Sequence, residues 1–317
     1  MKKMVILLWL VFSVVVCGGC DRHEPTPEHA TRPVVVTTLF PLYDFARSIV
    51  GSRMEVKLLL PPGVEPHHFE PRPEDIVTIQ RAALFIYTSP AMEPWAARLL
   101  AGLDQRRLRV VQAAAHVRLR EIGQKEQDDD AHDLPQSVSG HRQDPHVWLD
   151  FGNAQQMVDE MLAGIVAVDP GHAGEYRANA TALQHRLADL DRRFTQGLAN
   201  CTSRVVLHGG HYAFGYLARR YHLTYLAAEG VSADNEPSPR QLAELVQQIR
   251  SNRLGAVFSE ELVSPRLADS LAAETGVRVL RLNGAHNLTK DQFERGVTFF
   301  DLMEQNLHNL RQGLGCR

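Results

Sequence analysis

The 317-residue sequence has little net charge, few cysteines and only one long hydrophobic run, and these shortages exclude several classes of protein. Its formal charge is −3, and its lysines and arginines form no basic stripe, so nucleic acid is not an expected partner. Its apolar run, residues 4–16, is interrupted by Ser13 and is shorter than the roughly 20 residues of a transmembrane helix. Beyond the N-terminus about 285 residues remain, enough for two lobes or one large α/β domain.

The N-terminus has the pattern of a targeting segment. Two lysines precede the apolar run, and two glycines and Cys20 follow it. A positive start and a short apolar core are typical of a secretory signal, and small residues before a cysteine resemble a bacterial lipobox. We predict a signal peptide over 1–19, lipid attachment at Cys20 and a flexible tether over 20–32. Cleavage without lipid attachment is the alternative.

The expected location is therefore outside the cytoplasm. Asp21 directly after the lipidation site resembles a signal for retention on the inner membrane. This favours the periplasmic side of that membrane, with the cell surface as the alternative. Of the four cysteines, Cys201 and Cys316 remain after the N-terminal pair is assigned. Two cysteines in an oxidising compartment favour a disulfide, and two free thiols are the alternative.

Short apolar runs alternate with helical patterns along the rest of the chain. Predicted strands cover 34–39, 55–60, 84–88, 109–112, 204–208, 224–227, 255–259 and 277–282. Predicted helices cover 42–50, 73–81, 94–103, 213–221, 239–252, 265–275 and 290–312, several with proline in the first turn. Repeated strand–helix units are typical of an α/β fold with parallel sheets flanked by helices.

A long helical pattern divides this alternation into two lobes. Residues 171–199 carry one apolar stripe, and no predicted strand interrupts them. We therefore predict an N-terminal lobe over 33–169, a linking helix over 170–200 and a C-terminal lobe over 201–317. The segment 123–144 is polar and acidic without apolar periodicity, and is expected to form a loop. Cys201 and Cys316 then fall at the edge opposite the strand carboxyl ends, where a bridge is geometrically reasonable.

Four of the fifteen histidines are candidate ligands because of where they lie in the predicted fold. Three lie in loops just past the carboxyl ends of strands, and the fourth lies where the chain leaves the acidic loop and rejoins the N-terminal lobe. They are His67, His211 and His286 and, at the acidic loop, His146. Open α/β sheets form their ligand crevices at those ends, so four imidazoles, two from each lobe, are expected to meet around one ion. Neighbouring His68 and His208 are weaker candidates.

Four imidazoles favour zinc. Neutral imidazole nitrogen suits tetrahedral Zn²⁺ at about 2.0–2.1 Å, whereas Mn²⁺ prefers oxygen ligands. Cu²⁺ and Ni²⁺ have comparable or higher intrinsic affinity for such a site, so selectivity must come from geometry and supply. Glu70, Asp150 and Glu260 are predicted to accept hydrogen bonds from the rings and orient them.

At this point the chain resembles the zinc/manganese substrate-binding proteins of ABC importers over nearly its whole length after the tether. The resemblance rests on Pro66-His67, Glu70-Pro71-Arg72-Pro73-Glu74-Asp75, Asp144-Pro145-His146-Val147-Trp148-Leu149-Asp150, His211-Tyr212-Ala213-Phe214-Gly215-Tyr216 and Glu236-Pro237-Ser238-Pro239. It implies two α/β lobes joined by one rigid helix, with metal held in the cleft between them. It also implies a monomer that delivers Zn²⁺ to an ABC permease and its ATPase, with His67, His146 and His211 in three ligand roles.

The fourth ligand departs from the family pattern. Manganese-type members have an aspartate in the loop after the last strand and several zinc-type members have a glutamate, whereas His286 stands there in this chain. An imidazole in place of a carboxylate keeps a ligand and removes a charge, which further disfavours manganese. In the alternative, His286 points away and either water or Glu260 completes the shell.

Other functions stay open from the sequence. A zinc hydrolase needs an open coordination position and a general base, and the chain has no His-Glu-x-x-His helix, so we do not expect an enzyme. A binding protein for manganese or another transition metal, a surface adhesin, and a lipoprotein for an organic solute are the remaining alternatives. Stoichiometric zinc binding without substrate turnover distinguishes transport from catalysis.

Overall fold

The computed structural model describes residues 32–122, 143–228, 238–260 and 265–317. The predicted signal peptide (1–19), Cys20 and nearly all of the tether (20–32) lie outside the described residues, as does most of the acidic loop (123–144). Residues Pro33–Arg317 form one compact unit, so the lobe limits at 169 and 201 stay predictions. No helix in the described ranges combines the length and apolar character needed to cross a lipid bilayer.

The N-terminal lobe is built on a parallel four-stranded sheet in the order β2-β1-β3-β4. Its strands are β1 (Val34–Thr37), β2 (Glu55–Leu58), β3 (Leu84–Tyr87) and β4 (Arg109–Gln112). Neighbouring side chains point to opposite faces: Val35 joins the core with α2 (Phe40–Val50) and α5 (Phe151–Val168). Val36 joins a separate core with α3 (Pro73–Arg81) and α4 (Pro94–Gly102). Helices therefore cover both faces, as parallel sheets require.

The C-terminal lobe repeats this design with the strand order β10-β9-β7-β8. Its strands are β7 (Val205–His208), β8 (Thr224–Ala227), β9 (Ala256–Glu260) and β10 (Arg278–Leu282). One face packs on α8 (Pro239–Ser251) and α9 (Arg266–Thr275) through the core containing Leu207 and Val257. The other packs on α7 (Gly215–Arg220) and α11 (Phe299–Leu314). The predicted α/β fold with two parallel sheets is confirmed.

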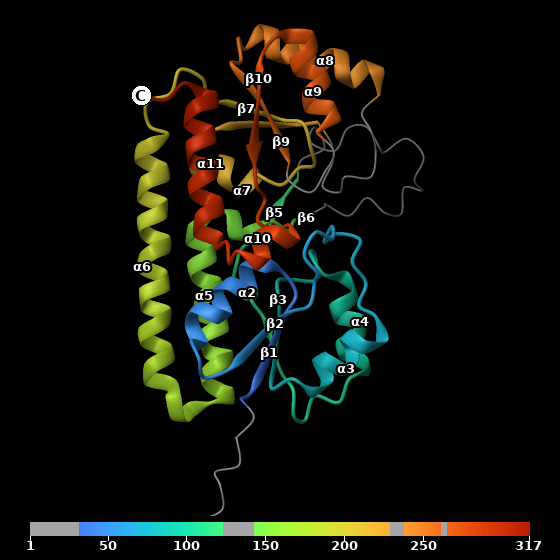
Figure 1. The fold of residues 1–317 in the computed structure, drawn as a ribbon, viewed down its shortest axis with the longest axis vertical. Helices are drawn as coiled ribbons and strands as arrows, with labels where there is room; N and C mark the ends of the chain where they lie inside the picture. Colours follow the sequence, from blue (N-terminus) through green and yellow to red (C-terminus); the bar gives the residue numbers. More distant parts are fainter. Residues whose placement is uncertain (1–31, 123–142, 229–237, 261–264) are drawn as a thin grey trace, which may run out of the picture. The chain divides into compact units, whose positions relative to one another are not determined.

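Helix α6 (Ala173–Gly197) connects the two sheets. Its 25 residues extend about 37 Å at 1.5 Å per residue. Figure 1 shows α6 running beside α5 of the N-terminal lobe and α11 of the C-terminal lobe, and it contacts both helices. A buried stripe from Tyr176 to Phe194 joins a core cluster that contains residues of both lobes. The lobes are therefore held together by shared packing as well as by the chain.

Two helices differ from the predictions. The stretch after Asp150 was not predicted as a helix, yet it forms α5, whose first turn is capped by the Asp150 carboxylate. The single predicted helix 290–312 is instead two helices, α10 (Lys290–Glu294) and α11. The backbone turns at Gly296, where φ is 69°, and α11 starts anew because Thr298 accepts a hydrogen bond from the Asp301 N–H.

Two small features complete the description. A short antiparallel ribbon pairs β5 (Arg120–Glu121) with β6 (Gln143–Asp144) at the two ends of the acidic loop. Cys201, before β7, and Cys316, after α11, form a disulfide bond that joins residues 115 positions apart.

Candidate metal centre

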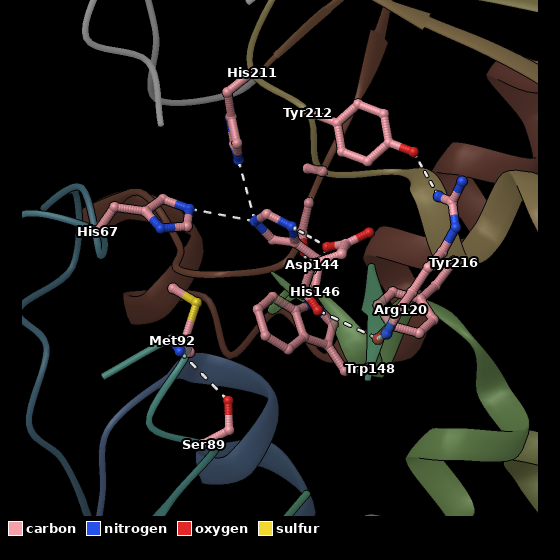
Figure 2. A network of polar contacts seen from close by, with 12 residues as sticks. His67, Ser89, Met92, Arg120, Asp144, His146, Trp148, His211, Tyr212 and Tyr216 are labelled. Carbon is pink, nitrogen blue, oxygen red and sulfur yellow. Dashed lines mark hydrogen bonds and ion pairs between the residues drawn. The ribbon is translucent and has the colours of Figure 1, made fainter. Parts of the chain in front are cut away.

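The four predicted histidines meet in one place. His67 lies between β2 and α3, His146 follows β6, His211 follows β7, and His286 follows β10. One nitrogen from each ring lies within 4.8 Å of the other three. Their ring centroids are 4.9–5.8 Å apart. Figure 2 shows the rings of His67 and His211 pointing toward that of His146. Each lobe contributes two imidazoles, and His286 points inward with the others.

The spacing of the nitrogens matches a tetrahedral ion. The Nε2 atom of His146 lies 3.2 Å from Nε2 of His67 and 3.4 Å from Nε2 of His211. Nitrogens bound at about 2.0–2.1 Å to a tetrahedral zinc are separated by roughly 3.3–3.4 Å. These two edges therefore agree with the dimensions of a Zn²⁺ shell.

Two carboxylates determine which ring nitrogens carry protons. Nδ1 of His146 is 2.8 Å from Oδ1 of Asp144, and Nδ1 of His211 is 2.6 Å from Oε2 of Glu260. An ionised carboxylate can only accept, so each Nδ1 must be the protonated nitrogen. Both Nε2 atoms then present lone pairs to each other across 3.4 Å. Facing lone pairs repel unless a cation lies between them, so this arrangement is built for a metal.

Burial keeps the rings in the form that binds metal. His146, His211 and His286 are buried, and His67 is half-buried. Desolvation and the neighbouring imidazoles hold the pKa of His146 and the pKa of His286 well below the ordinary histidine value. Nε2 of His286 is buried with no hydrogen-bond partner in the described part of the chain. Unpartnered buried polar atoms are rare in proteins, and a metal ion would satisfy this one.

The loop after β10 is shaped to turn His286 inward. A Cβ atom on Gly284 would lie 2.3 Å from Cε1 of His286, so the ring can occupy this place only beside glycine. The next residue, Ala285, has a φ of 57°, in the left-handed region that non-glycine residues rarely adopt. Asn283 stabilises the turn by accepting the Ala285 N–H at 2.7 Å, and Asn306 of α11 bonds the Asn283 backbone twice.

Trp148 and a pair of tyrosines support the histidines from outside. The Trp148 indole donates to the Gly284 carbonyl at 2.8 Å, and its ring packs edge-on against His146 and His286. The Tyr216 hydroxyl accepts from the Arg120 backbone N–H and donates to the Asp144 carbonyl. The Arg120 side chain donates to the hydroxyl of Tyr212, the residue after His211 (Figure 2). The β5–β6 ribbon is thus bonded to the segment that carries His211.

Two of the predicted orienting carboxylates lie elsewhere. Glu70 forms an exposed ion pair with Arg98. Asp150 caps α5 and pairs with Arg220. Glu260, predicted either to orient a ring or to complete the shell, accepts a hydrogen bond from Nδ1 of His211. The sequence did not predict a role for Asp144. Its carboxylate accepts both the backbone N–H and the Nδ1–H of His146, which lies two residues later. An aspartate at that spacing from a ligand histidine is therefore a usable signal.

The two weaker histidine candidates lie outside the cluster. His68 is exposed, and its backbone N–H donates to Glu65. His208 is fully buried beside Phe214, and Nδ1 lies 3.2 Å from the Tyr225 hydroxyl. Burial lowers the pKa of His208 to about 4.

The chain matches known proteins over most of its length. The family model described as "ZnuA: Zinc-uptake complex component A periplasmic" matches residues 35–313. The "High-affinity zinc uptake system protein ZnuA" of Bacillus subtilis (strain 168) is 34% identical over 301 residues, covering 95% of this chain and 93% of that protein. The "Zinc-binding lipoprotein AdcA" of Streptococcus pneumoniae (strain ATCC BAA-255 / R6) is 34% identical over 312 residues, which are 98% of this chain and 61% of that protein.

A solved structure has a similar fold. The Zn(II)-bound ZnuA-like domain of Streptococcus pneumoniae AdcA superposes with a TM-score of 0.75 at 31% sequence identity. The match covers 89% of this chain and 99% of that domain. This chain spans 61% of the length of full AdcA and corresponds to its ZnuA-like part.

Proposed function

Because the chain belongs to the zinc-uptake complex component A family, we propose that it binds Zn²⁺ outside the cytoplasm and delivers it to an ABC importer. A membrane permease and its ATPase are the proposed partners, and lipid on Cys20 attaches the protein, as a monomer, to the periplasmic side of the inner membrane. Cys20 lies outside the described residues, so its sequence context alone supports the anchor.

The convergence of four imidazoles from two lobes carries this proposal. His67, His146, His211 and His286 are the proposed ligands, because their nitrogens are within 4.8 Å of one another. A neutral four-nitrogen shell favours Zn²⁺ over Mn²⁺, which prefers oxygen. Asp144 and Glu260, each bonded to a ligand ring, bring two negative charges that balance the divalent ion. Zinc-binding names of the relatives support the same cargo.

We propose transfer and not catalysis as the role of the ion. Four protein ligands complete a tetrahedral shell, whereas a catalytic zinc keeps a position open for water. A surface adhesin role stays an alternative to transport.

Zinc titration of protein prepared without a histidine tag tests the proposal. We expect one tightly bound Zn²⁺ per chain and, in His146→Ala, an affinity loss of more than about 100-fold, because removing a ligand should cost more than removing its supporting residue. His116→Ala is the matched control, since His116 is exposed and pairs with Glu160 away from the cluster. Equal zinc affinity in His146→Ala and wild type would contradict the site, and zinc-dependent ester or peptide turnover would contradict a transport role.

A further inference from the structure

The loop that carries His67 is bonded directly to the opposite lobe. This His67 loop, residues 61–72, has no helix or strand of its own. The side-chain amide of Asn287 donates to the Pro61 carbonyl at 2.7 Å and to the Val64 carbonyl at 2.9 Å. A third hydrogen bond runs from the Gly63 N–H to the Leu288 carbonyl at 2.7 Å. We call the two bonds from Asn287 the Asn287 bridge.

The buried side-chain amide of Asn287 uses both of its hydrogen-bond donors in the bridge. Nδ2 of Asn287 has two protons, and each goes to a carbonyl of the His67 loop. Its Oδ1 accepts the Leu288 N–H at 2.8 Å, and only this orientation of the amide satisfies all three partners. Asn287 is 2% exposed, whereas Val64 is exposed. Breaking the bridge therefore leaves the buried Asn287 amide without its two acceptors, which is costly.

The segment that carries Asn287 is held on both sides of the cleft. Within the C-terminal lobe, Asn306 of α11 bonds the Asn283 backbone twice. Across the cleft, the carbonyl of His286, the residue before Asn287, accepts the N–H of Phe40, the first residue of α2, at 3.1 Å. The bridge thus connects a firmly held segment, next to one proposed ligand, to the loop that carries another. None of its bonds uses a ring nitrogen, so the bridge can be removed without removing a proposed ligand.

The His67 loop is also the side of the site that faces solvent. The other three proposed ligands are buried, whereas His67 is half-buried. In the same loop Gly63, Val64 and His68 are exposed, with Val64 at 38%. An ion that enters or leaves on this side must displace the His67 loop, and displacement breaks the Asn287 bridge.

We propose that Asn287 is a positioning residue whose bridge holds the His67 loop in place and limits the rate of zinc exchange. The proposal rests on the zinc-binding function proposed above. The bridge is expected to control the rate of zinc exchange more than the zinc affinity. Losing a ligand weakens equilibrium binding, whereas losing the bridge removes no metal–nitrogen bond and speeds both association and dissociation.

The test measures zinc dissociation into excess fluorescent chelator by stopped flow. Loss of two partly buried hydrogen bonds in Asn287→Ala predicts dissociation about 10- to 100-fold faster, with a smaller change in Kd. The absorption spectrum of the Co²⁺-loaded variant should keep its tetrahedral form. Asn287→Leu, which retains the side-chain volume, should behave like the alanine variant and guards against an effect of the cavity on folding.

Asn309→Ala is the matched control. Asn309 is likewise a buried asparagine, 8% exposed, whose amide donates to a carbonyl, that of Arg281, within the C-terminal lobe. We expect it to leave the dissociation rate within about threefold of wild type. Unchanged dissociation in both Asn287 variants, or equal acceleration in Asn309→Ala, would overturn the bridge. Absence of stoichiometric zinc in wild type would instead overturn the proposed function.

Discussion

At the scale of single residues, the centre depends on carboxylates that do not face the ion. Asp144 and Glu260 each hold the far nitrogen of one ring, which fixes the tautomer and directs the lone pair inward. Both carboxylates are buried with their histidines. Their charges are stabilising mainly when the cluster holds a dication, so the site is matched to metal in charge as well as in shape.

Asp144→Asn should weaken zinc binding by about 10- to 100-fold, the range typical when a partner of a ligating histidine is lost. The amide keeps the volume but removes the charge that fixes the His146 tautomer. Competition against a chromogenic chelator measures the effect. Asp150→Asn provides a control from the same segment, because Asp150 caps α5 and pairs with Arg220. A loss in Asp150→Asn as large as that in Asp144→Asn would show that general damage, and not ring orientation, is responsible.

His208 should make the metal-free fold sensitive to acid. Burial lowers the pKa of His208 to about 4, below the ordinary value near 6.5. As the pH falls through 6.5 the unfolded chain therefore takes up this proton first. Folding stability drops between pH 6.5 and 4, by up to about 3 kcal/mol for this group. Urea unfolding with chelator present, at pH 7.5 and 5.0, should show a smaller loss in His208→Gln than in wild type. Identical losses would mean that His208 is not buried in its neutral form.

The ligand histidines could be predicted from sequence because they follow a rule of topology. Loops past strand carboxyl ends gather at one edge of a parallel sheet, so strand positions placed His67 at that edge of one sheet and His211 and His286 at that edge of the other. Their convergence followed from the prediction of two lobes that face each other. Side-chain direction within such loops follows no comparable rule. Glu70 and Asp150 lie near ligand histidines in the sequence, yet both pair with arginines.

At the scale of elements, apolar runs predicted the strands well and the helices less completely. Strands buried on both faces are continuous apolar segments, which makes them visible in sequence. Helix α5 contains Gly152 and Gly164, which lower helical propensity. A Cβ on Gly164 would lie 2.4 Å from Val111, so close packing on the sheet requires this glycine. That requirement is tertiary and cannot be seen in local sequence.

The loop after β10 offers a test at this scale. Gly284→Ala places a Cβ atom 2.3 Å from Cε1 of His286, so the ring must move out of the cluster. We expect at least a tenfold loss of zinc affinity, measured by chelator competition. Gly174→Ala is the control, because a Cβ at Gly174 meets nothing within 4 Å. Wild-type affinity in Gly284→Ala would imply that His286 contributes little to binding and that another group completes the shell.

At the scale of the whole molecule, ligands divided between two lobes make zinc a cross-link. His67 and His146 come from the N-terminal lobe, and His211 and His286 from the C-terminal lobe. The core cluster shared through α6 already holds the lobes together. An ion that binds both should therefore stabilise one common unfolding transition and not one lobe alone.

Thermal unfolding tests this cross-link. Zinc at 100 times its Kd should add about 2.7 kcal/mol to the free energy of unfolding, which raises Tm by roughly 4–5 °C for a chain of this size. Mn²⁺ at the same concentration should raise Tm less, because an imidazole shell binds it weakly.

Hydrogen exchange should slow in the His67 loop and in the loop after β10 together. His67→Ala and His286→Ala, one from each lobe, should both remove the shift, while His116→Ala should keep it. Retention of the full shift in either variant would show that the substituted histidine is not a ligand. Two zinc-dependent transitions would show that the lobes unfold independently.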